Sequence, residues 1–184
     1  GKFAEYVIPV PVPIKGGTTM IDRDEGPRAD TSLETLSKLR PAFKKDGTVT
    51  AGNSCPMSDG ASMTLMMPET KARDLGYTSW FKIRSAAASG IHPDVMGLGP
   101  VEASRKALAL SGLTWKDIGL IEINEAFAVQ ALACIHELEL DEARVNVNGG
   151  AIALGHPLGC SGARIIGTLA HEMRFRNVQF GLAT

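Results

Sequence analysis

Residues 119–164 read GLIEINEAFAVQALACIHELELDEARVNVNGGAIALGHPLGCSGAR, and this stretch decides the fold class. The apolar run at 119–123 predicts a strand, and the segment from about 125 to 137 predicts a helix. A second short strand is expected at 145–149, and the residues after 161 carry apolar side chains at helical spacing. Strands that alternate with helices of this length indicate an α/β protein in which helices cover a sheet.

The alternation continues on both sides of this stretch. Thr31 lies three residues before Glu34, which is the spacing of a capping box, and Pro41 ends the helix expected there. Prolines at alternate positions within residues 7–17 forbid a helix and favour an edge strand or an extended arm. The run at 61–67 has the length of a buried strand, although its periodicity alone does not exclude a helix. The other expected elements are strands at 47–53, 80–88 and 178–183 and helices at 31–40, 69–75, 100–110 and 161–174.

Composition excludes several classes of function. The 184 residues include 19 Lys and Arg against 20 Asp and Glu, a net charge of −1 that argues against a general binder of polyanions, nucleic acids included. The apolar runs fall far short of the roughly 18 residues that a membrane-spanning helix needs. Cys55, Cys134 and Cys160 show no CxxC spacing, so neither a disulfide framework nor a zinc ribbon is expected, and a reducing, cytoplasmic environment fits best.

The densest candidate for chemistry is the segment 146–164, which holds five glycines. Within it His156 lies between Gly155 and Pro157, just before an expected helix, so a rigid loop presents the imidazole ring. A neutral imidazole in that position can take a proton or donate a hydrogen bond to a developing oxyanion. A tight strand-to-helix turn, in which His156 packs against its neighbours and has no chemical role, explains the same residues equally well.

Asn124 begins the sequence NEAFA at the junction of an expected strand and an expected helix. Asn is among the best N-cap residues, so on the residues alone capping outweighs a role in orienting a water molecule or a carbonyl group.

Two possible nucleotide-binding loops fail at the decisive residue. Residues 150–155 are followed by His-Pro where a phosphate-binding loop needs Lys and Ser or Thr. Residues 97–102 place Glu102 where a dinucleotide fingerprint needs its third glycine. The other histidines form no pair with metal-ligand spacing, so no metal site is expected.

NEAFA at 124–128 and NGGAIALGHPLGCSGAR at 148–164 resemble, in this order, the two diagnostic motifs of the thiolase family. The resemblance covers nearly the whole chain and implies an α/β, thiolase-like layered α-β-α half-fold. It also implies two units: a partial loop segment that binds CoA at 1–55 and a C-terminal thiolase domain at 56–184. Segments similar to those around the family's motifs are RPAF (40–43), GTVTAGN (47–53), SDGAS (58–62), VMGLGP (95–100) and QFGLAT (179–184).

The resemblance implies an acetyl-CoA acyltransferase of fatty acid metabolism that moves acyl groups between CoA thioesters through an acyl-cysteine. Carried over by motif, His156 activates the nucleophilic cysteine. With a water molecule held by Asn124, it also stabilises the thioester oxyanion. Coenzyme A is then a co-substrate rather than a resident cofactor, and thiolase relatives are dimers or tetramers, so a homo-oligomer is expected.

The resemblance also implies residues that contact CoA. Arg28 matches a basic residue near the phosphates and the adenine, where a guanidinium suits phosphate geometry. Cys55 falls where the family often has a serine that hydrogen-bonds pantetheine, and a thiol is a weaker donor. The positions that match the lining of the narrow pantetheine tunnel are Phe43, Ala51, Met96 and Phe127.

The chain departs from the family pattern in its cysteines. The family's nucleophile belongs to the N-terminal half, and the cysteine of its CxGG motif would lie just beyond Thr184. We therefore expect the chain to be a C-terminal portion of a thiolase, truncated before the CxGG motif and inactive by itself. The particular residues of the motifs favour the degradative 3-ketoacyl type. The alternatives are an acetoacetyl-CoA thiolase and a non-catalytic, thiolase-like module that binds CoA or a partner chain.

Overall fold

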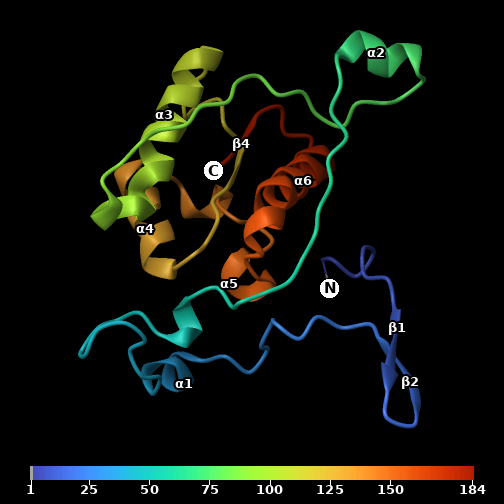
Figure 1. The fold of residues 1–184 in the computed structure, drawn as a ribbon. Coiled ribbons are helices and arrows are strands. Elements are labelled where there is room, and N and C mark those ends of the chain that lie inside the picture. The colour runs from blue at the N-terminus through green and yellow to red at the C-terminus, as the bar shows by residue number, and fades with distance from the viewer. Residues whose placement is uncertain (1) are drawn as a thin grey trace.

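A computed structural model describes residues 2–184 and places a small parallel sheet between two layers of helices (Figure 1). Strands β3 (Leu120–Glu122) and β4 (Gly181–Ala183) pair in parallel, with Ile121 opposite Leu182. This arrangement confirms the α/β class that the sequence predicts.

Helix α6 (Leu158–Arg176) packs against one face of the sheet, and α3 (Gly99–Ser111) and α4 (Ala128–Glu137) pack on the other. The core lies between the sheet and the two helices α3 and α4, where burial of apolar side chains stabilises the fold. Its buried members are Val101, Leu108, Ile118, Ile121, Ile123, Ala131, Cys134, Leu138 and Leu182.

The structure confirms the long helices and changes some of their ends. α3 ends as predicted at Gly112, whose φ of 70° is the left-handed conformation that glycine adopts without strain. α6 begins at Leu158, earlier than expected, and α2 (Glu69–Asp74) matches its prediction closely. α1 (Leu33–Ser37) is shorter than predicted, and its capping box is formed by Ser32 and Thr35 rather than by Thr31 and Glu34.

The proline-rich N-terminal segment forms the edge strand expected of it. β1 (Val10–Ile14) pairs with β2 (Gly17–Ile21) in an exposed antiparallel hairpin that projects from the rest of the chain (Figure 1). Gly16 in the turn has φ 92°, which supplies the left-handed backbone that the tight turn requires.

Several predicted strands are absent from the described part of the chain. Residues 47–53 instead contain the short 3-10 helix η1 (Ala51–Asn53), and 145–149 contribute a single bridge between Val145 and Ile121. Residues 61–67 and 80–88 form an irregular strap that pairs with no strand within residues 2–184, and this strap carries α2 away from the sheet (Figure 1). A strand needs a paired neighbour to satisfy its backbone, so the apolar pattern alone did not produce one.

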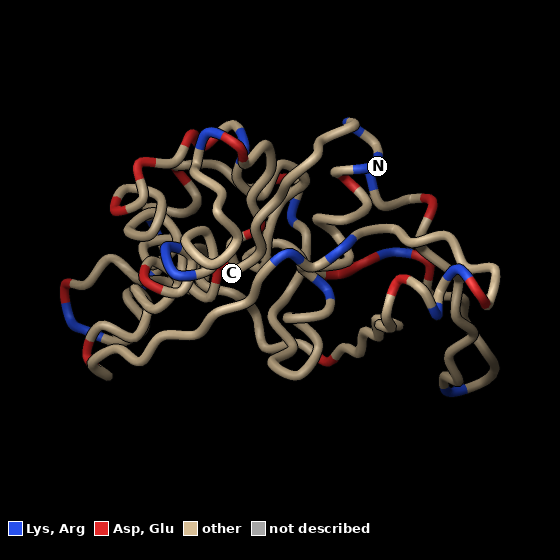
Figure 2. The backbone as a smooth tube through the Cα atoms, turned by 90° about the horizontal axis from the view of Figure 1, so that it is seen from above, with Lys and Arg blue, Asp and Glu red and all other residues tan. Residues whose placement is uncertain are grey.

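The remaining short elements connect the layers around the site. They are η2 (Pro93–Leu98), η3 (Glu142–Arg144) and α5 (Ala151–Leu154). Figure 2 shows that basic and acidic residues are interspersed along the chain rather than gathered in one stretch. Among residues 2–184, no helix combines the length and the apolar character that crossing a bilayer requires.

Candidate active site

The loop after β3 and the loop before α6 bring Asn124 and His156 together. The amide Nδ2 of Asn124 lies 3.3 Å from Nε2 of His156. The backbone N–H of Asn124 donates to the carbonyl oxygen of Thr184 at 2.9 Å, which ties this loop to the end of β4. Asn124 is not an N-cap, because α4 begins only at Ala128 and Phe127 occupies the cap position. The capping interpretation of Asn124 is therefore wrong.

The other side of the His156 ring faces the first turn of α6. Nδ1 of His156 lies 2.7 Å from the hydroxyl oxygen of the buried Ser161, and that hydroxyl donates to the carbonyl oxygen of Pro157 at 3.1 Å. The loop that presents the ring requires a glycine, because Gly155 has φ 96° and a Cβ there would collide with the Ser58 side chain. Both ring nitrogens of His156 are thus held by protein groups.

A carboxylate joins the Asn124 loop to the segment that leads to His156. Glu125 accepts hydrogen bonds from the Asn146 amide at 2.8 Å and from the backbone N–H of Ile152, in α5, at 3.2 Å. Asn146 in turn exchanges two hydrogen bonds of 2.8 Å with the backbone of Ile123. We call this set of residues, Glu125, Asn146 and Ile152, the carboxylate clamp. Since it connects both loops, it fixes the distance between the two candidate catalytic side chains.

Gly150 lies directly under the carboxylate clamp, and a Cβ at this position would collide with the Glu125 carboxylate. We expect Gly150→Ala to lower the free energy of unfolding by about 1–3 kcal/mol through overpacking, measured by urea denaturation. The matched control is Gly159→Ala. A Cβ at Gly159 meets nothing within 4 Å, and Gly→Ala within a helix is expected to add about 0.5–1 kcal/mol. Equal stability of the two variants would contradict the tight packing of Glu125 on Gly150.

The structure gathers three of the six residues predicted to bind CoA at the start of α4. The rings of Phe43 and Phe127 meet edge to face with centroids 5.6 Å apart. The backbone N–H of Cys55 donates to the carbonyl oxygen of Ala126 at 3.1 Å, next to Phe127. Phe43 is 74% exposed, so one side of this group of residues is open to solvent.

The other three predicted CoA-binding residues lie on separate exposed segments. Ala51 begins η1, and Met96 is exposed on η2, which packs beside α4. Arg28 belongs to an exposed loop, and nearby Gly26 comes so close to α5 that a Cβ would lie 2.7 Å from the carbonyl oxygen of Ala153. The roles of all six residues in CoA binding stay predictions.

Glu122 is a buried carboxyl group on the sheet face that packs against α6. Burial raises its pKa to about 7, and the negative charges of Glu125 and Glu172 act in the same direction. The positive charge of Arg164 lowers the pKa, but the combined raising effect of burial and of the two carboxylates is larger. Burial at this position therefore stabilises the protonated form of Glu122 relative to an exposed carboxyl group.

Glu172, a buried carboxyl group on α6, behaves in the opposite way. Its burial would raise the pKa, but hydrogen bonds from Asn148, Arg176 and Lys2 outweigh burial and lower the pKa to about 2. Lys2 lies 3.1 Å from the carboxylate and its ammonium group lies over the ring of Phe175, so the N-terminal segment is fastened to α6.

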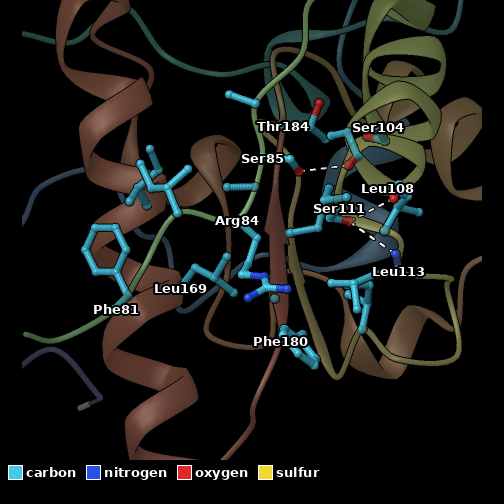
Figure 3. A pocket seen from close by; sticks show the side chains of 18 of the residues that line it. Phe81, Arg84, Ser85, Ser104, Leu108, Ser111, Leu113, Leu169, Phe180 and Thr184 are labelled. Atoms are coloured by element: carbon cyan, nitrogen blue, oxygen red, sulfur yellow. Dashed lines mark hydrogen bonds between the residues drawn. The ribbon is translucent and has the colours of Figure 1, made fainter. Parts of the chain in front are cut away.

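A largely apolar cavity of about 290 Å³ lies elsewhere, between the strap at 81–87, α3, α6 and β4 (Figure 3). Phe81, Leu108 and Leu169 line it, and the hydroxyl of Ser85 on its wall donates to the carbonyl oxygen of Ala107 at 2.8 Å. Neither the two candidate catalytic residues nor any predicted CoA-binding residue lines this cavity. It adjoins the site at Thr184, whose carbonyl oxygen accepts from the Asn124 backbone.

The described residues offer little for binding a metal ion or for thiol chemistry at this site. Within residues 2–184, no three His, Cys, Asp or Glu side chains are grouped so that they could hold a metal ion. Cys55, Cys134 and Cys160 are all free thiols, and Cys134 is fully buried with its Sγ donating to the Gly97 carbonyl oxygen at 3.2 Å. No hydrogen bond joins any of the three to His156 in the described chain.

Comparison with known proteins gives the family. The model of the thiolase C-terminal domain matches residues 77–184, and that of the thiolase N-terminal domain matches residues 1–70. The chain belongs to the thiolase family. It is 51% identical to the 3-ketoacyl-CoA thiolase of Bacillus subtilis, over all of this chain and 49% of that protein. It is also 51% identical to the acetyl-CoA acetyltransferase of Pseudomonas aeruginosa, over all of this chain and 47% of that protein.

Solved structures agree with this family and with the fold. The acetyl-CoA acetyltransferase of Bacillus anthracis superimposes with a TM-score of 0.93 at 43% identity, over all of this chain and 46% of that one. Human mitochondrial 3-ketoacyl-CoA thiolase in complex with CoA gives a TM-score of 0.80 at 46% identity, over 91% of this chain and 42% of that one. This thiolase chain therefore spans about half the length of the relatives that it matches.

Sequence reasoning missed the residues that support the site. Ser161, Glu125 and Asn146 contact the candidate catalytic loops through hydrogen bonds that depend on side-chain direction. The one available signal was the short spacing between His156 and Ser161, which places His156 just before α6 and Ser161 in its first turn.

Proposed function

We propose that this chain forms part of an acyl-CoA thiolase in which His156 and Asn124 act on the thioester. The observation that carries the proposal is the 3.3 Å approach of the Asn124 amide to Nε2 of His156, between loops that lie far apart in the sequence. Relatives that match the whole chain carry the names 3-ketoacyl-CoA thiolase and acetyl-CoA acetyltransferase.

The geometry suits a thiolate mechanism. Nε2 of His156 takes the proton of a cysteine thiol, and the thiolate attacks the acyl carbonyl carbon to give an oxyanion. The new Nε2–H of His156 then donates to that oxyanion. Oδ1 of Asn124 is buried and has no hydrogen-bond partner within residues 2–184, which supports its proposed role in holding a water molecule beside the thioester.

The nucleophile is proposed to come from outside this chain. A nucleophile and its base must lie within hydrogen-bond reach, and none of the three thiols makes that contact with His156 in residues 2–184. Residues 1–55 are proposed to be the CoA-binding loop segment and 56–184 the C-terminal thiolase domain. The group of residues at Phe43, Cys55 and Phe127 would then face the pantetheine arm.

A hybrid enzyme tests this proposal. We expect the purified 184-residue chain to show no cleavage of acetoacetyl-CoA by free CoA, because it holds no reactive cysteine beside His156. A hybrid in which this chain replaces the matching half of the Bacillus subtilis relative is expected to cleave the thioester. Turnover by the isolated chain would refute the proposal that the nucleophilic cysteine comes from outside this chain. A folded hybrid that binds CoA without turnover would instead favour a non-catalytic, CoA-binding module.

The same hybrid separates the two proposed substrate classes. The motifs favour the degradative 3-ketoacyl type, and we propose that the hybrid accepts 3-ketoacyl-CoA substrates with longer acyl chains. Activity confined to the four-carbon substrate would assign the acetoacetyl-CoA type instead. We propose further that the intact thiolase is a homo-oligomer, and that its free thiols suit a reducing cytoplasm.

A further inference from the structure

His156 has two ring nitrogens, and the groups around them differ in what they can donate. Nε2 faces the amide nitrogen of Asn124, which carries hydrogens and no lone pair for a hydrogen bond. Nδ1 faces the hydroxyl oxygen of Ser161, which can donate one hydrogen and also accept. The carbonyl oxygen of Pro157, which only accepts, lies 3.1 Å from the same hydroxyl.

We propose that Ser161 is a positioning residue that holds the neutral His156 ring in the tautomer with its proton on Nδ1. In this arrangement Nδ1–H donates to the Ser161 oxygen, the Ser161 hydroxyl donates to Pro157, and the amide of Asn124 donates to Nε2. Every hydrogen then meets an acceptor. In the opposite tautomer, Nε2–H would point at the N–H of the Asn124 amide, so two donors would face each other.

The surroundings of Ser161 keep its hydroxyl in place. The residue is 4% exposed and lies in the first turn of α6, where its backbone N–H also donates to the Pro157 carbonyl oxygen at 3.0 Å. A buried hydroxyl in this position can satisfy its hydrogen-bonding groups only locally. Ser161 therefore acts through His156 and need not touch a substrate.

The consequence for catalysis rests on the function proposed above. In the isolated chain the lone pair of Nε2 accepts from the Asn124 amide, so the amide must give way to the cysteine thiol before Nε2 takes the thiol proton. After that step the ring carries hydrogens on both nitrogens, and Nε2–H can donate to the oxyanion while Nδ1–H stays on Ser161. The hydroxyl of Ser161 thereby decides which nitrogen serves as the base.

The test uses the isolated chain labelled with nitrogen-15 in its histidines, at alkaline pH where imidazole rings are neutral. The shifts of the ring nitrogens report the tautomer, and His156→Asn identifies the signals of this residue. We expect the Nδ1–H form to predominate. Ser161→Ala should lower the ratio of Nδ1–H to Nε2–H by about fivefold, the factor for losing one net hydrogen bond.

The control is Ser62→Ala, which removes a hydroxyl that donates to the carbonyl oxygen of Cys160 at 2.6 Å on the same helix without touching His156. Ser62→Ala should leave the ratio unchanged, and Ser161→Thr, which keeps the hydroxyl, should restore it. A predominant Nε2–H form in the unmodified chain would overturn the proposal even if Ser161→Ala failed to fold. Because this readout needs no turnover, an inactive hybrid would refute the proposed function while leaving the tautomer result intact.

Discussion

Replacing His156 with alanine in the hybrid thiolase is expected to lower kcat by about 10²–10⁴-fold, the usual contribution of a positioned general acid or base. The imidazole would both take the thiol proton and donate to the oxyanion, so its removal affects two stages of the reaction. The measurement is steady-state cleavage of acetoacetyl-CoA, with KM determined separately. We expect KM to change much less than kcat, because the ring stabilises the transition state more than the bound substrate.

The matched control is His136→Ala, which removes an exposed histidine near the end of α4, away from the site. This variant should retain the turnover of the parent hybrid. If His156→Ala also retained it, His156 would be a packed turn residue, as the alternative interpretation of its sequence holds.

Glu122→Gln is expected to make the chain more stable at about pH 8 by up to about 3 kcal/mol. Folding raises the pKa of Glu122 from 4.5 to about 7, so the folded chain binds this proton more tightly than the unfolded chain does. The contribution of the Glu122 proton to stability is therefore fully present below about pH 4.5 and is lost as the pH rises through about 7. Glutamine has the same shape and carries no charge to bury, so the variant escapes this decline.

Urea denaturation at about pH 5 and about pH 8 measures the effect, which should appear mainly at the higher pH. Loss of the attraction to Arg164 acts against the gain, since that cation would remain without its neighbouring carboxylate. Glu102→Gln is the control, because Glu102 is a half-exposed partner of Arg105 on α3 and should change the stability little at either pH. A less stable Glu122→Gln at about pH 8 would show that the pair with Arg164 outweighs burial.

The sequence was sufficient for the elements whose signals are local. Gly112 ends α3 through its own backbone conformation, and the apolar spacing at 161–174 predicts most of α6 but not its start at Leu158. The strap at 61–67 shows the opposite case. Its apolar pattern fits a strand, yet Met63 is 95% exposed, because a strand depends on a partner that its own residues do not specify.

The candidate site shows the same difference between local signals, which the sequence contains, and contacts that depend on distant segments. The motifs pointed to Asn124 and His156, and the structure brings these side chains within 3.3 Å of each other. The sequence did not predict the contacts of Ser161 or Glu125, since each depends on the direction of a side chain across two loops. Nor did it predict that α4 begins after Phe127, which leaves Asn124 free of a capping role.

The pairing of β3 with β4 has a consequence for how the chain reaches its native state. Leu120 and Gly181 are partners in one ladder, although three α-helices (α4, α5 and α6) and the 3-10 helix η3 lie between them in sequence. During synthesis β3 cannot pair with β4 until Ala183 has left the ribosome. The backbone hydrogen bond from Asn124 to Thr184 can also form only after that point. Parallel pairings between distant segments close slowly. The helices are therefore expected to assemble first, and the geometry of the candidate site should arise in a late step of folding.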